Sequence, residues 1–338
     1  ADLQLWRPEH PKLYNVVVRA ASDAVQDQIG FRSIETRGTE ILLNGQPVFL
    51  RGISIHEESP FGDGRAYSVD EAAVLLGWAK EMNCNFVRLA HYPHNENMVR
   101  VADRLGLMVW SEIPVYWTVQ FENPDVLGLA QQQLHEMVDR DKNRASVVLW
   151  SVANETPESA ARMAFLTHLA QEVRKRDPTR LVTAALDTQS YEENGIRIDD
   201  PFGDIVDVIG VNSYCGWYGN SLPADCAGIT WYSDYGKPVI FSEFGGGALQ
   251  GLHGSELERW TEEYQSSVYR HNLEMLDGID FLAGTSPWIL KDFRSPRRPL
   301  PAIQDFWNRK GLISDRGIRK EAFYIMQDWY AKKRDVER

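Results

Sequence analysis

Residues 86–112 read FVRLAHYPHNENMVRVADRLGLMVWSE. An apolar run at Phe86–Ala90 is followed by helical periodicity over Asn97–Leu105 and by a second apolar run at Leu107–Glu112. Short apolar strands separated by an amphipathic helix are typical of a parallel sheet. The stretch therefore predicts one strand–helix–strand unit of an α/β fold.

The same alternation continues through the chain from about Pro47. The other candidate strands are Val48–Ile55, Val147–Ala153, Leu181–Leu186, Val206–Val211, Val239–Glu243 and Phe281–Ile289. Helical stretches lie between most of them, including Asp70–Glu81, Gln131–Asp141, Ala160–Arg174 and Glu256–Leu276. Eight strands in this rhythm favour a closed (β/α)₈ TIM barrel over residues 39–338. No glycine-rich dinucleotide fingerprint follows any strand, which weakens the alternative of an open doubly wound sheet.

The first 38 residues have a different pattern, with strand signals and no helix. Leu13–Ala20 is rich in β-formers, and Phe31–Thr36 and Ile41–Leu43 lie beside Asn44-Gly45, a strong hairpin turn signal. So short a segment cannot bury a core of its own, and we interpret residues 1–38 as the last strands of a β-sandwich. The start at Ala1, without an initiator Met, is typical of a fragment or a mature form.

Composition excludes several classes of function. The chain has 338 residues and a net charge of −12, and a chain this acidic is not expected to offer the basic face that nucleic acid requires. No apolar run approaches the ~18 residues of a membrane span, so no membrane partner is expected. Aromatic residues make up 11% of the chain, including 11 Trp, which serves a large core or sugar-binding surfaces equally well.

The three cysteines, Cys84, Cys215 and Cys226, give neither an even framework nor metal-ligand spacing. Cys84 lies beside an apolar run and is expected in the core. We therefore expect no structural disulfide network, and the cellular compartment stays open.

Two glutamates directly follow buried apolar runs. Glu155 comes after the fourth predicted strand and Glu243 ends the seventh, at the end of the barrel where active sites lie. Cleaving a glycosidic bond with retention requires one carboxylic acid and one carboxylate on the two sides of the bond. We expect Glu155 to be the protonated partner, and Glu243 to stay ionised through hydrogen bonds from neighbours such as Tyr214.

Longer motifs around these glutamates resemble glycoside hydrolase family 2. They are RDKNRASVVLWSVANE at residues 140–155, NFVRLAHYP at 85–93 and LWRPEHPKLY at 5–14. The resemblance spans about residues 40 to 330 and implies that Glu155 is the general acid/base and Glu243 the nucleophile. It implies also that Asn154 binds the sugar 2-hydroxyl, and that residues 1–38 belong to an immunoglobulin-like domain.

Within that family the sequence looks most like the β-glucuronidases. The matching segments are NSYCGWY at 212–218, ALQGLHG at 248–254, WTEEYQ at 260–265 and NRKG at 308–311. The resemblance implies that Tyr214 orients the nucleophile, with Tyr218 in the same segment. It places Trp288 in the active site, and Asn308 and Lys310 on the carboxylate of a uronic acid, where a Lys ammonium and an Asn amide both bind well.

One departure from the glucuronidase pattern concerns that carboxylate site. Those enzymes have an Arg four residues before the Asn, whereas this chain has Gln304. Three arginines in a longer loop are candidates to substitute in space: Arg294, Arg297 and Arg298.

Other polar side chains follow the first three strands. The resemblance makes His56 and His91 walls of the active site, with His91 as a hydrogen-bonding scaffold or sugar contact. We expect Arg88 to be a buried partner of Glu243, and Glu112 to be structural. His56, His91 and Glu112 come from three strands, and their spacing argues for no metal; the chemistry needs no metal and no cofactor.

The predicted function is a retaining, exo-acting β-glucuronidase acting on a carbohydrate β-glycoside. A β-galactosidase or β-galacturonidase of the same family is the near alternative, and a catalytically incomplete carbohydrate-binding fragment is a second. A dehydrogenase barrel is disfavoured, because Gly245-Gly246-Gly247 lacks the spacing of a phosphate-binding loop. The aglycone and the oligomeric state stay open, and a homo-oligomer is compatible with the sequence.

Overall fold

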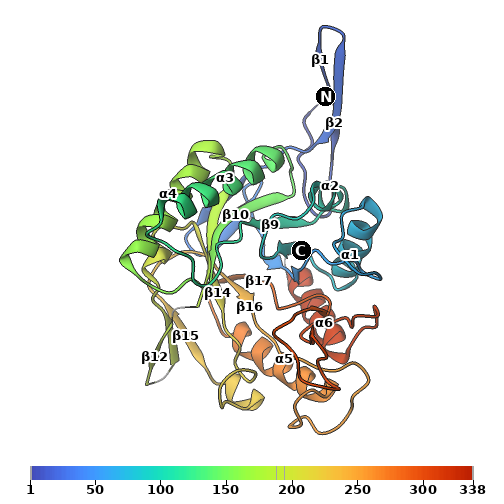
Figure 1. The fold of residues 1–338 in the computed structure, drawn as a ribbon, viewed down its shortest axis with the longest axis vertical. Coiled ribbons are helices and arrows are strands. Elements are labelled where there is room, and N and C mark those ends of the chain that lie inside the picture. The colour runs from blue at the N-terminus through green and yellow to red at the C-terminus, as the bar shows by residue number, and fades with distance from the viewer. Residues whose placement is uncertain (1, 188, 194, 337–338) are drawn as a thin grey trace.

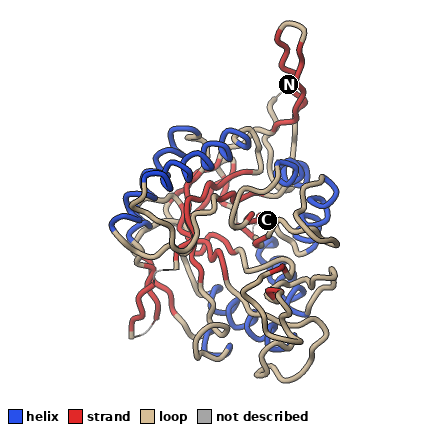
Figure 2. Tube along the Cα trace, in the orientation of Figure 1, coloured by secondary structure: helices blue, strands red, loops and turns tan. Residues whose placement is uncertain are grey.

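The computed structural model describes residues 2–187, 189–193 and 195–336. Its centre is a strongly curled parallel sheet of nine strands, TIM-barrel-like, with helices around it (Figures 1 and 2). The sheet order is β6 (Leu50–Arg51), β17 (Leu282–Thr285), β16 (Val239–Glu243), β14 (Val208–Asn212), β11 (Leu181–Leu186), β10 (Val147–Asn154), β9 (Met108–Glu112), β8 (Phe86–Leu89) and β7 (Ser54–Ile55). The predicted α/β class is confirmed.

The two ends of the sheet meet at one chain segment. β6 pairs with β17, and β7, two residues further along the chain, pairs with β8. Gly52 and Ile53 connect these strands, and the Gly52 N–H donates to Thr285 O at 2.8 Å. A Cβ at this position would lie 2.4 Å from the Phe86 ring, so only glycine fits between the neighbouring strands.

Six α-helices lie in the described part of the chain. They are α1 (Val69–Glu81), α2 (Glu96–Leu105), α3 (Pro124–Asp141), α4 (Ala160–Arg176), α5 (Glu262–Asp277) and α6 (Glu321–Val336). None of them is long and apolar enough to cross a membrane. Where helices would follow β11 and β14, the described chain has the 3₁₀ turns η1 (Pro201–Asp204) and η2 (Pro223–Cys226) instead. A small sheet of β12 (Gln189–Glu192), β13 (Gly195–Ile198) and β15 (Thr230–Ser233) accompanies them.

One part of the N-terminal segment packs against residues of the central sheet, and the other part projects from the molecule. Trp6 is fully buried and shares a hydrophobic cluster with Ile41 of β4 (Glu40–Leu43) and with Trp110 of β9. β4 pairs with β3 (Ile34–Arg37) and, through the predicted Asn44-Gly45 turn, with β5 (Gln46–Pro47). The hairpin of β1 (Tyr14–Ala20) and β2 (Asp23–Ile29) instead projects from the molecule (Figure 1). An immunoglobulin-like domain is not confirmed by these strands.

The cysteine prediction was wrong in one respect. Cys215 and Cys226 form a disulfide that closes the loop between β14 and η2, whereas Cys84 is buried and free. The pairing was missed because the two residues lie on an irregular loop, where spacing in sequence does not reveal distance in space. A count of three also pointed away from a disulfide.

Candidate active site

Glu155 and Glu243 lie at the carboxyl ends of β10 and β16, which β11 and β14 separate in the curled sheet. Glu243 is the last residue of β16 and is only 4% exposed. Glu155 directly follows β10 and has a positive φ of 48°, a conformation uncommon for residues other than glycine. Its N–H donates to Ala185 O of β11 at 2.9 Å, so the turn is tied to the neighbouring strand.

Both oxygens of the Glu243 carboxyl group accept hydrogen bonds. Arg88 Nη1 donates to Oε1 at 2.9 Å, and the Tyr214 hydroxyl donates to Oε2 at 2.5 Å, as predicted for Tyr214. Burial raises the pKa of Glu243 above its ordinary value, and the negative charge of Glu155 acts in the same direction. Arg88, His91 and the Tyr214 hydroxyl act in the opposite direction and favour the carboxylate.

The Glu155 carboxyl group is held by two nitrogen donors. Trp117 Nε1 donates to Oε2 at 2.7 Å, and Asn212 Nδ2 donates to Oε1 at 2.8 Å. Asn154 Oδ1 accepts from Asn212 at 3.2 Å and from Arg88 at 2.6 Å. A continuous hydrogen-bond network through Asn212, Asn154 and Arg88 therefore joins the two glutamates.

Arg88, on β8, links Asn154 to Glu243 in this network. It is fully buried, and its Nε and Nη2 also donate to Glu112 at 3.0 and 3.1 Å. Burial opposes ionisation of Glu112, but Arg88 and His91 outweigh it and hold the pKa of this carboxyl at about 2. Arg88 thus neutralises two buried carboxylates, as expected for a structural partner rather than a ligand.

Stacked rings form one wall of the site. The His91 ring lies 4.7 Å from Trp288 and 5.2 Å from Tyr116, nearly parallel to both, and Tyr116 stacks on Trp117 at 4.5 Å. His56 packs edge-on against Trp288 at 5.1 Å. Burial, together with the positive charges around it, lowers the pKa of His56 well below its ordinary value, so this imidazole is neutral.

A basic group of side chains, Lys310 with Tyr218 and Asn308, lies on the Tyr214 side of Glu243. Lys310 is 3% exposed, and its Nζ donates to the Tyr218 hydroxyl at 2.7 Å and lies 5.4 Å from the centre of the Tyr214 ring. Asn308 Oδ1 accepts the Lys310 backbone N–H at 3.1 Å, which fixes the turn between them. Burial lowers the pKa of Lys310. Among the described residues no carboxylate pairs with this ammonium.

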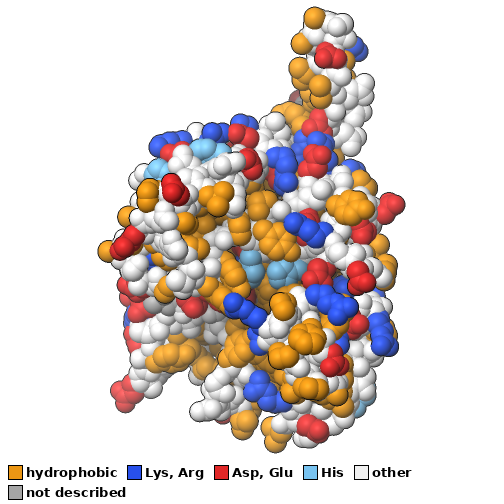
Figure 3. All heavy atoms as spheres, viewed as in Figure 1, with side chains coloured by type: hydrophobic (Ala, Val, Ile, Leu, Met, Phe, Trp, Pro, Cys, Tyr) orange, Lys and Arg blue, Asp and Glu red, His pale blue; other side chains and the backbone are white. Residues whose placement is uncertain are grey.

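All ten predicted site residues belong to one connected set of contacts. They are Glu155, Glu243, Asn154, Tyr214, Tyr218, His91, His56, Trp288, Asn308 and Lys310. Figure 3 shows histidine side chains near the middle of one face, with hydrophobic and basic side chains around them. The arrangement can present one carboxyl group on each side of a bound sugar, and a buried cation next to one of them.

Comparison with known proteins places this arrangement in a family. Residues 34–330 match the family described as glycosyl hydrolases family 2, TIM barrel domain. The chain belongs to glycosyl hydrolase family 2.

Its relatives in the family include β-glucuronidases and a β-galacturonidase. A β-glucuronidase of Streptococcus agalactiae serotype V is 32% identical over 93% of the chain and 56% of the relative. The structure of Bifidobacterium dentium β-glucuronidase complexed with coumarin-3-O-glucuronide has a TM-score of 0.87 and 27% identity, over 98% of this chain and 55% of that one. A family 2 β-galacturonidase from Eisenbergiella tayi, bound to glycerol, has a TM-score of 0.86 and 26% identity, over 98% and 59%. The chain thus spans a little over half the length of these relatives.

Two residues of this family 2 site were not foreseen from the sequence. Asn212 lies in the segment 212–218, which resembles the β-glucuronidases, but its bridge between Glu155 and Asn154 follows only from the fold. Trp117 lies on a loop after β9 and has a positive φ of 56°, and no motif marks it. Its side chain reaches Glu155 across 38 residues of sequence, a contact that periodicity cannot reveal.

The three loop arginines lie in different places. Arg298 Nη2 donates to the Tyr218 hydroxyl at 3.0 Å, beside Lys310. The Arg297 guanidinium lies 4.6 Å from the centre of the Trp117 ring. Arg294 is turned toward Trp307, at 4.2 Å, and toward Asp63. Arg298 is therefore the arginine that shares a partner with Lys310.

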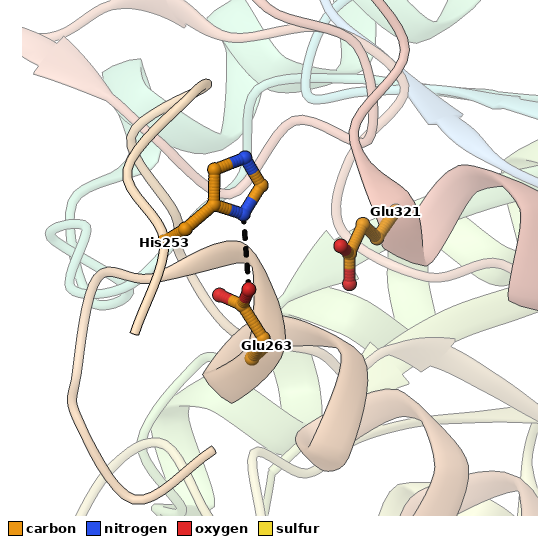
Figure 4. A group of neighbouring side chains, drawn as sticks. All are labelled: His253, Glu263 and Glu321. Atoms are coloured by element: carbon orange, nitrogen blue, oxygen red, sulfur yellow. Dashed lines mark hydrogen bonds and ion pairs between the residues drawn. The ribbon is translucent and has the colours of Figure 1, made fainter. Parts of the chain in front are cut away.

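A separate group of ligand-type side chains lies outside this site. His253, Glu263 and Glu321 place one ligand atom each within 4.8 Å of one another, and His253 Nδ1 pairs with Glu263 at 3.0 Å (Figure 4). The His253 side chain is 56% exposed, and the carboxylate beside it raises the pKa of the imidazole. The group includes none of the ten predicted residues and supplies no part of the chemistry described below.

Proposed function

We propose that the chain is the catalytic barrel of a retaining, exo-acting β-glycosidase whose substrate is a β-glucuronide. The observation that carries the proposal is the buried Lys310 ammonium, which has no carboxylate partner among the described residues. Tyr214 links it to Glu243, since one face of its ring lies near Nζ and its hydroxyl binds the carboxyl group. An unpaired buried cation is costly, and a substrate carboxylate would pair it.

The first displacement forms a covalent glycosyl-enzyme. Glu155, as a carboxylic acid, gives its proton to the glycosidic oxygen while a Glu243 carboxylate oxygen attacks the anomeric carbon. The bond from this carbon to Glu243 forms as the bond to the leaving oxygen breaks. Arg88 and Tyr214 keep the attacking carboxylate ionised and oriented. The Asn154 amide nitrogen donates to the sugar 2-hydroxyl.

The second displacement releases the sugar with its configuration retained. Glu155, now a carboxylate, takes a proton from water, and the water oxygen attacks the anomeric carbon. The bond to Glu243 breaks and its carboxylate is restored. Trp117 and Asn212 hold Glu155 in place through both steps.

The uronic acid carboxylate binds to the basic group formed by Lys310, Asn308 and Tyr218. Lys310 supplies the charge, with the Asn308 amide and the Tyr218 hydroxyl as neutral donors at its sides. Each charge-assisted hydrogen bond contributes on the order of 1.5–3 kcal/mol. A neutral hexose lacks the carboxylate and leaves the Lys310 ammonium unpaired, so the same pocket that binds a uronic acid disfavours a galactoside.

The first experiment tests the reaction and both glutamates together. Nitrophenyl β-glucuronide, with the galactoside as control, is incubated with wild type, Glu243→Ala and Glu155→Ala. We expect glucuronide turnover in wild type, none in Glu243→Ala, and azide rescue in Glu155→Ala as a β-glucuronyl azide. Rescue with inverted configuration would contradict a retaining mechanism, and a preference for the galactoside would contradict the role of Lys310.

A second experiment isolates the carboxylate site. Lys310→Met keeps the length of the side chain and removes its charge. We expect kcat/KM for the glucuronide to fall by about ten- to hundredfold, the equivalent of one charge-assisted bond, while the low activity on the galactoside does not fall. Unchanged glucuronide turnover would refute the carboxylate role.

A β-galacturonidase is the second candidate, and one comparison favours it. The Eisenbergiella tayi β-galacturonidase has nearly the same fold as this chain. Glucuronic and galacturonic acids carry the same carboxylate and differ in the direction of the 4-hydroxyl, so Lys310 serves both. Assaying the two nitrophenyl uronides side by side separates these candidates.

We propose also that residues 1–38 are the remnant of an immunoglobulin-like β-sandwich and that residues 39–338 form the (β/α)₈ barrel. The projecting β1–β2 hairpin, with Val18 and Val25 largely exposed, supports this division. On this view an incomplete pocket is a specific alternative. Sugar binding without turnover, restored when the upstream domain is supplied, would establish that alternative.

A further inference from the structure

The side of the pocket that faces the leaving group carries a second cationic site. Glu155 must face the glycosidic oxygen in the proposed reaction, so the residues around it lie where the aglycone departs. Trp117 binds Glu155, and the Arg297 guanidinium covers Trp117 at 4.6 Å. Lys310 lies elsewhere, next to Glu243 through Tyr214. The two cations therefore face different parts of a substrate.

Arg297 is the outer end of a continuous stack. Trp288, His91, Tyr116 and Trp117 succeed one another, with interplanar angles of 14°, 20° and 25°. Tyr116 thus covers one face of the Trp117 ring, and Arg297 lies over the ring as well. Trp117 therefore supports the guanidinium rather than stacking on a sugar. A guanidinium packed on a ring keeps its N–H donors at its edge, where they can bind an anion.

The loop that carries Arg297 is braced before any ligand binds. It begins and ends in the paired strands β18 (Phe293–Arg294) and β19 (Trp307–Asn308). Ser295 N–H donates to Phe306 O at 2.8 Å, and Phe306 N–H donates to Arg298 O at 2.8 Å. Three prolines, Pro296, Pro299 and Pro301, further limit its conformations. The backbone that carries Arg297 and Arg298 is therefore constrained, although the Arg297 side chain is exposed.

Neither arginine has an acidic partner among the described residues. Arg298 donates to the neutral Tyr218 hydroxyl, and the exposed Arg297 lies over the Trp117 ring. By contrast, Arg294 in the same loop pairs with Asp63 and packs on Trp307. In a chain of net charge −12, two adjacent arginines, one over Trp117 and one bound to the Tyr218 hydroxyl, form a local concentration of positive charge.

The geometry points to an anion-binding site for the leaving group, in which Arg297, supported on Trp117, binds a carboxylate or sulfate of the aglycone. The substrate class is then a glucuronide linked to an acidic residue, as at the end of an acidic oligosaccharide, rather than to a neutral phenol. This inference rests on the proposed function, since it takes Glu155 as the acid that faces the leaving group. It goes further in naming the charge of the aglycone.

Matched substrates test the site. Phenyl, 4-carboxyphenyl and 4-trimethylammoniophenyl β-glucuronides differ in the charge of the leaving group, and comparing each variant with wild type cancels their different reactivities. We expect Arg297→Gln to reduce kcat/KM for the carboxyphenyl substrate about tenfold more than for the phenyl substrate. The trimethylammonio substrate should lose least or gain. Arg294→Gln is the control, and its ratio of carboxyphenyl to phenyl activity should stay at the wild-type value.

An equal loss on all three substrates would overturn the proposal, because Arg297 would then act only by packing on Trp117. A binding measurement distinguishes the absence of this anion site from the absence of glucuronidase activity. Calorimetry of a disaccharide of two glucuronic acids with Glu243→Gln, with and without Arg297→Gln, needs no turnover. Weaker binding in the double variant supports the site even if wild type hydrolyses no glucuronide, and equal affinity rejects it.

Discussion

Opposing influences act on the Glu243 carboxyl group. Burial raises its pKa, while Arg88 and the Tyr214 hydroxyl favour the charged form. The net direction is upward from 4.5, so at low pH the nucleophile is protonated and unable to attack. We therefore expect kcat/KM for the glucuronide to fall as the pH drops through the raised pKa, with an acidic limb above pH 4.5.

Replacing Tyr214 by Phe should move that limb. The lost donor no longer stabilises the carboxylate, so the pKa rises further and the acidic limb shifts to higher pH. We expect kcat/KM at the optimum to fall by about ten- to hundredfold, the contribution of one charge-assisted hydrogen bond. A pH profile of kcat/KM measures both effects. A lower rate with an unmoved limb would mean that Tyr214 acts on the sugar and not on Glu243.

Glu112 links the same network to acid stability. Its pKa is about 2 in the folded protein, against 4.5 ordinarily, so its ionisation stabilises the fold above pH 4.5. That stabilisation is lost as the pH falls from 4.5 toward 2. Glu112→Gln should lower the free energy of unfolding at neutral pH by about 3–5 kcal/mol, since Arg88 loses a buried partner.

Urea unfolding at a series of pH values tests this expectation. Between pH 4.5 and about 2, Glu112→Gln should lose less further stability than wild type does. The exposed Glu35→Gln serves as the control and should follow the wild-type curve. Parallel curves for wild type and Glu112→Gln would show that Arg88 does not hold this carboxyl ionised.

At the scale of elements, the loop from Tyr214 to Cys226 connects the two parts of the site. Tyr214 binds Glu243 and Tyr218 binds Lys310, and the Cys215–Cys226 disulfide closes the loop that bears them. The Tyr264 hydroxyl donates to Gly216 O at 2.8 Å and Arg259 donates to Trp217 O at 2.8 Å, so α5 and the segment before it support the loop.

Removing the disulfide should therefore affect stability and substrate binding together. A cross-link that closes a loop this short stabilises by about 2–3 kcal/mol in the chain-entropy account. We expect dithiothreitol, or the double variant Cys215→Ser/Cys226→Ser, to lower Tm and to raise KM for the glucuronide more than kcat falls. The double variant should be insensitive to dithiothreitol. If reduction leaves KM unchanged, the disulfide does not position the residues that bind the substrate.

Regular elements with strong local signals were predicted well from the sequence. The strand before Glu155 and the strand that ends in Glu243 were located within one residue, because their apolar runs are continuous and bounded. Helix starts were less accurate. The helix predicted from Gln131 begins at Pro124, where Asn123 caps the first turn, and the one predicted from Glu256 begins after the Thr261 cap. Capping residues determine these starts, whereas apolar periodicity alone does not mark them.

Contacts between distant segments were beyond prediction from residue patterns. The pairing of Trp117 with Glu155, the bridge of Asn212 and the stack beneath Arg297 depend on how loops from different strands converge. The site residues were instead predicted from the resemblance of whole motifs to a known family. Members of a family share the arrangement of these residues in space, which residue spacing alone does not reveal. The pattern of apolar residues also does not predict that η1, η2 and a small sheet take the place of two helices.

On the scale of the whole molecule, an anionic substrate is repelled by the net negative charge at long range and attracted by the cations of the site at short range. The chain has a net charge of −12, yet Lys310, Arg297 and Arg298 gather at the pocket. At about 0.01 M salt the Debye length is about 30 Å, so the whole negative surface repels an anionic substrate. At about 0.1 M the length is about 10 Å, and mainly the nearby cations are felt.

We therefore expect kcat/KM for the glucuronide to pass through a maximum with ionic strength. It should rise about twofold between about 0.01 and 0.1 M and fall again toward about 1 M, where the local cations are screened as well. The galactoside, which is neutral, should show neither change. Stopped assays across this range in sodium chloride measure the effect, and a monotonic increase would mean that the pocket exerts no local attraction.

The state of the three cysteines, all of them in the described chain, has a use in labelling. Cys215 and Cys226 are joined, and Cys84 is 3% exposed with a pKa raised by burial, so it offers thiol reagents very little thiolate. A single cysteine introduced at the exposed Leu257, on the loop between β16 and α5, would therefore react selectively. A fluorophore attached there without removing any native cysteine would report on movement of this loop while a substrate binds and leaves.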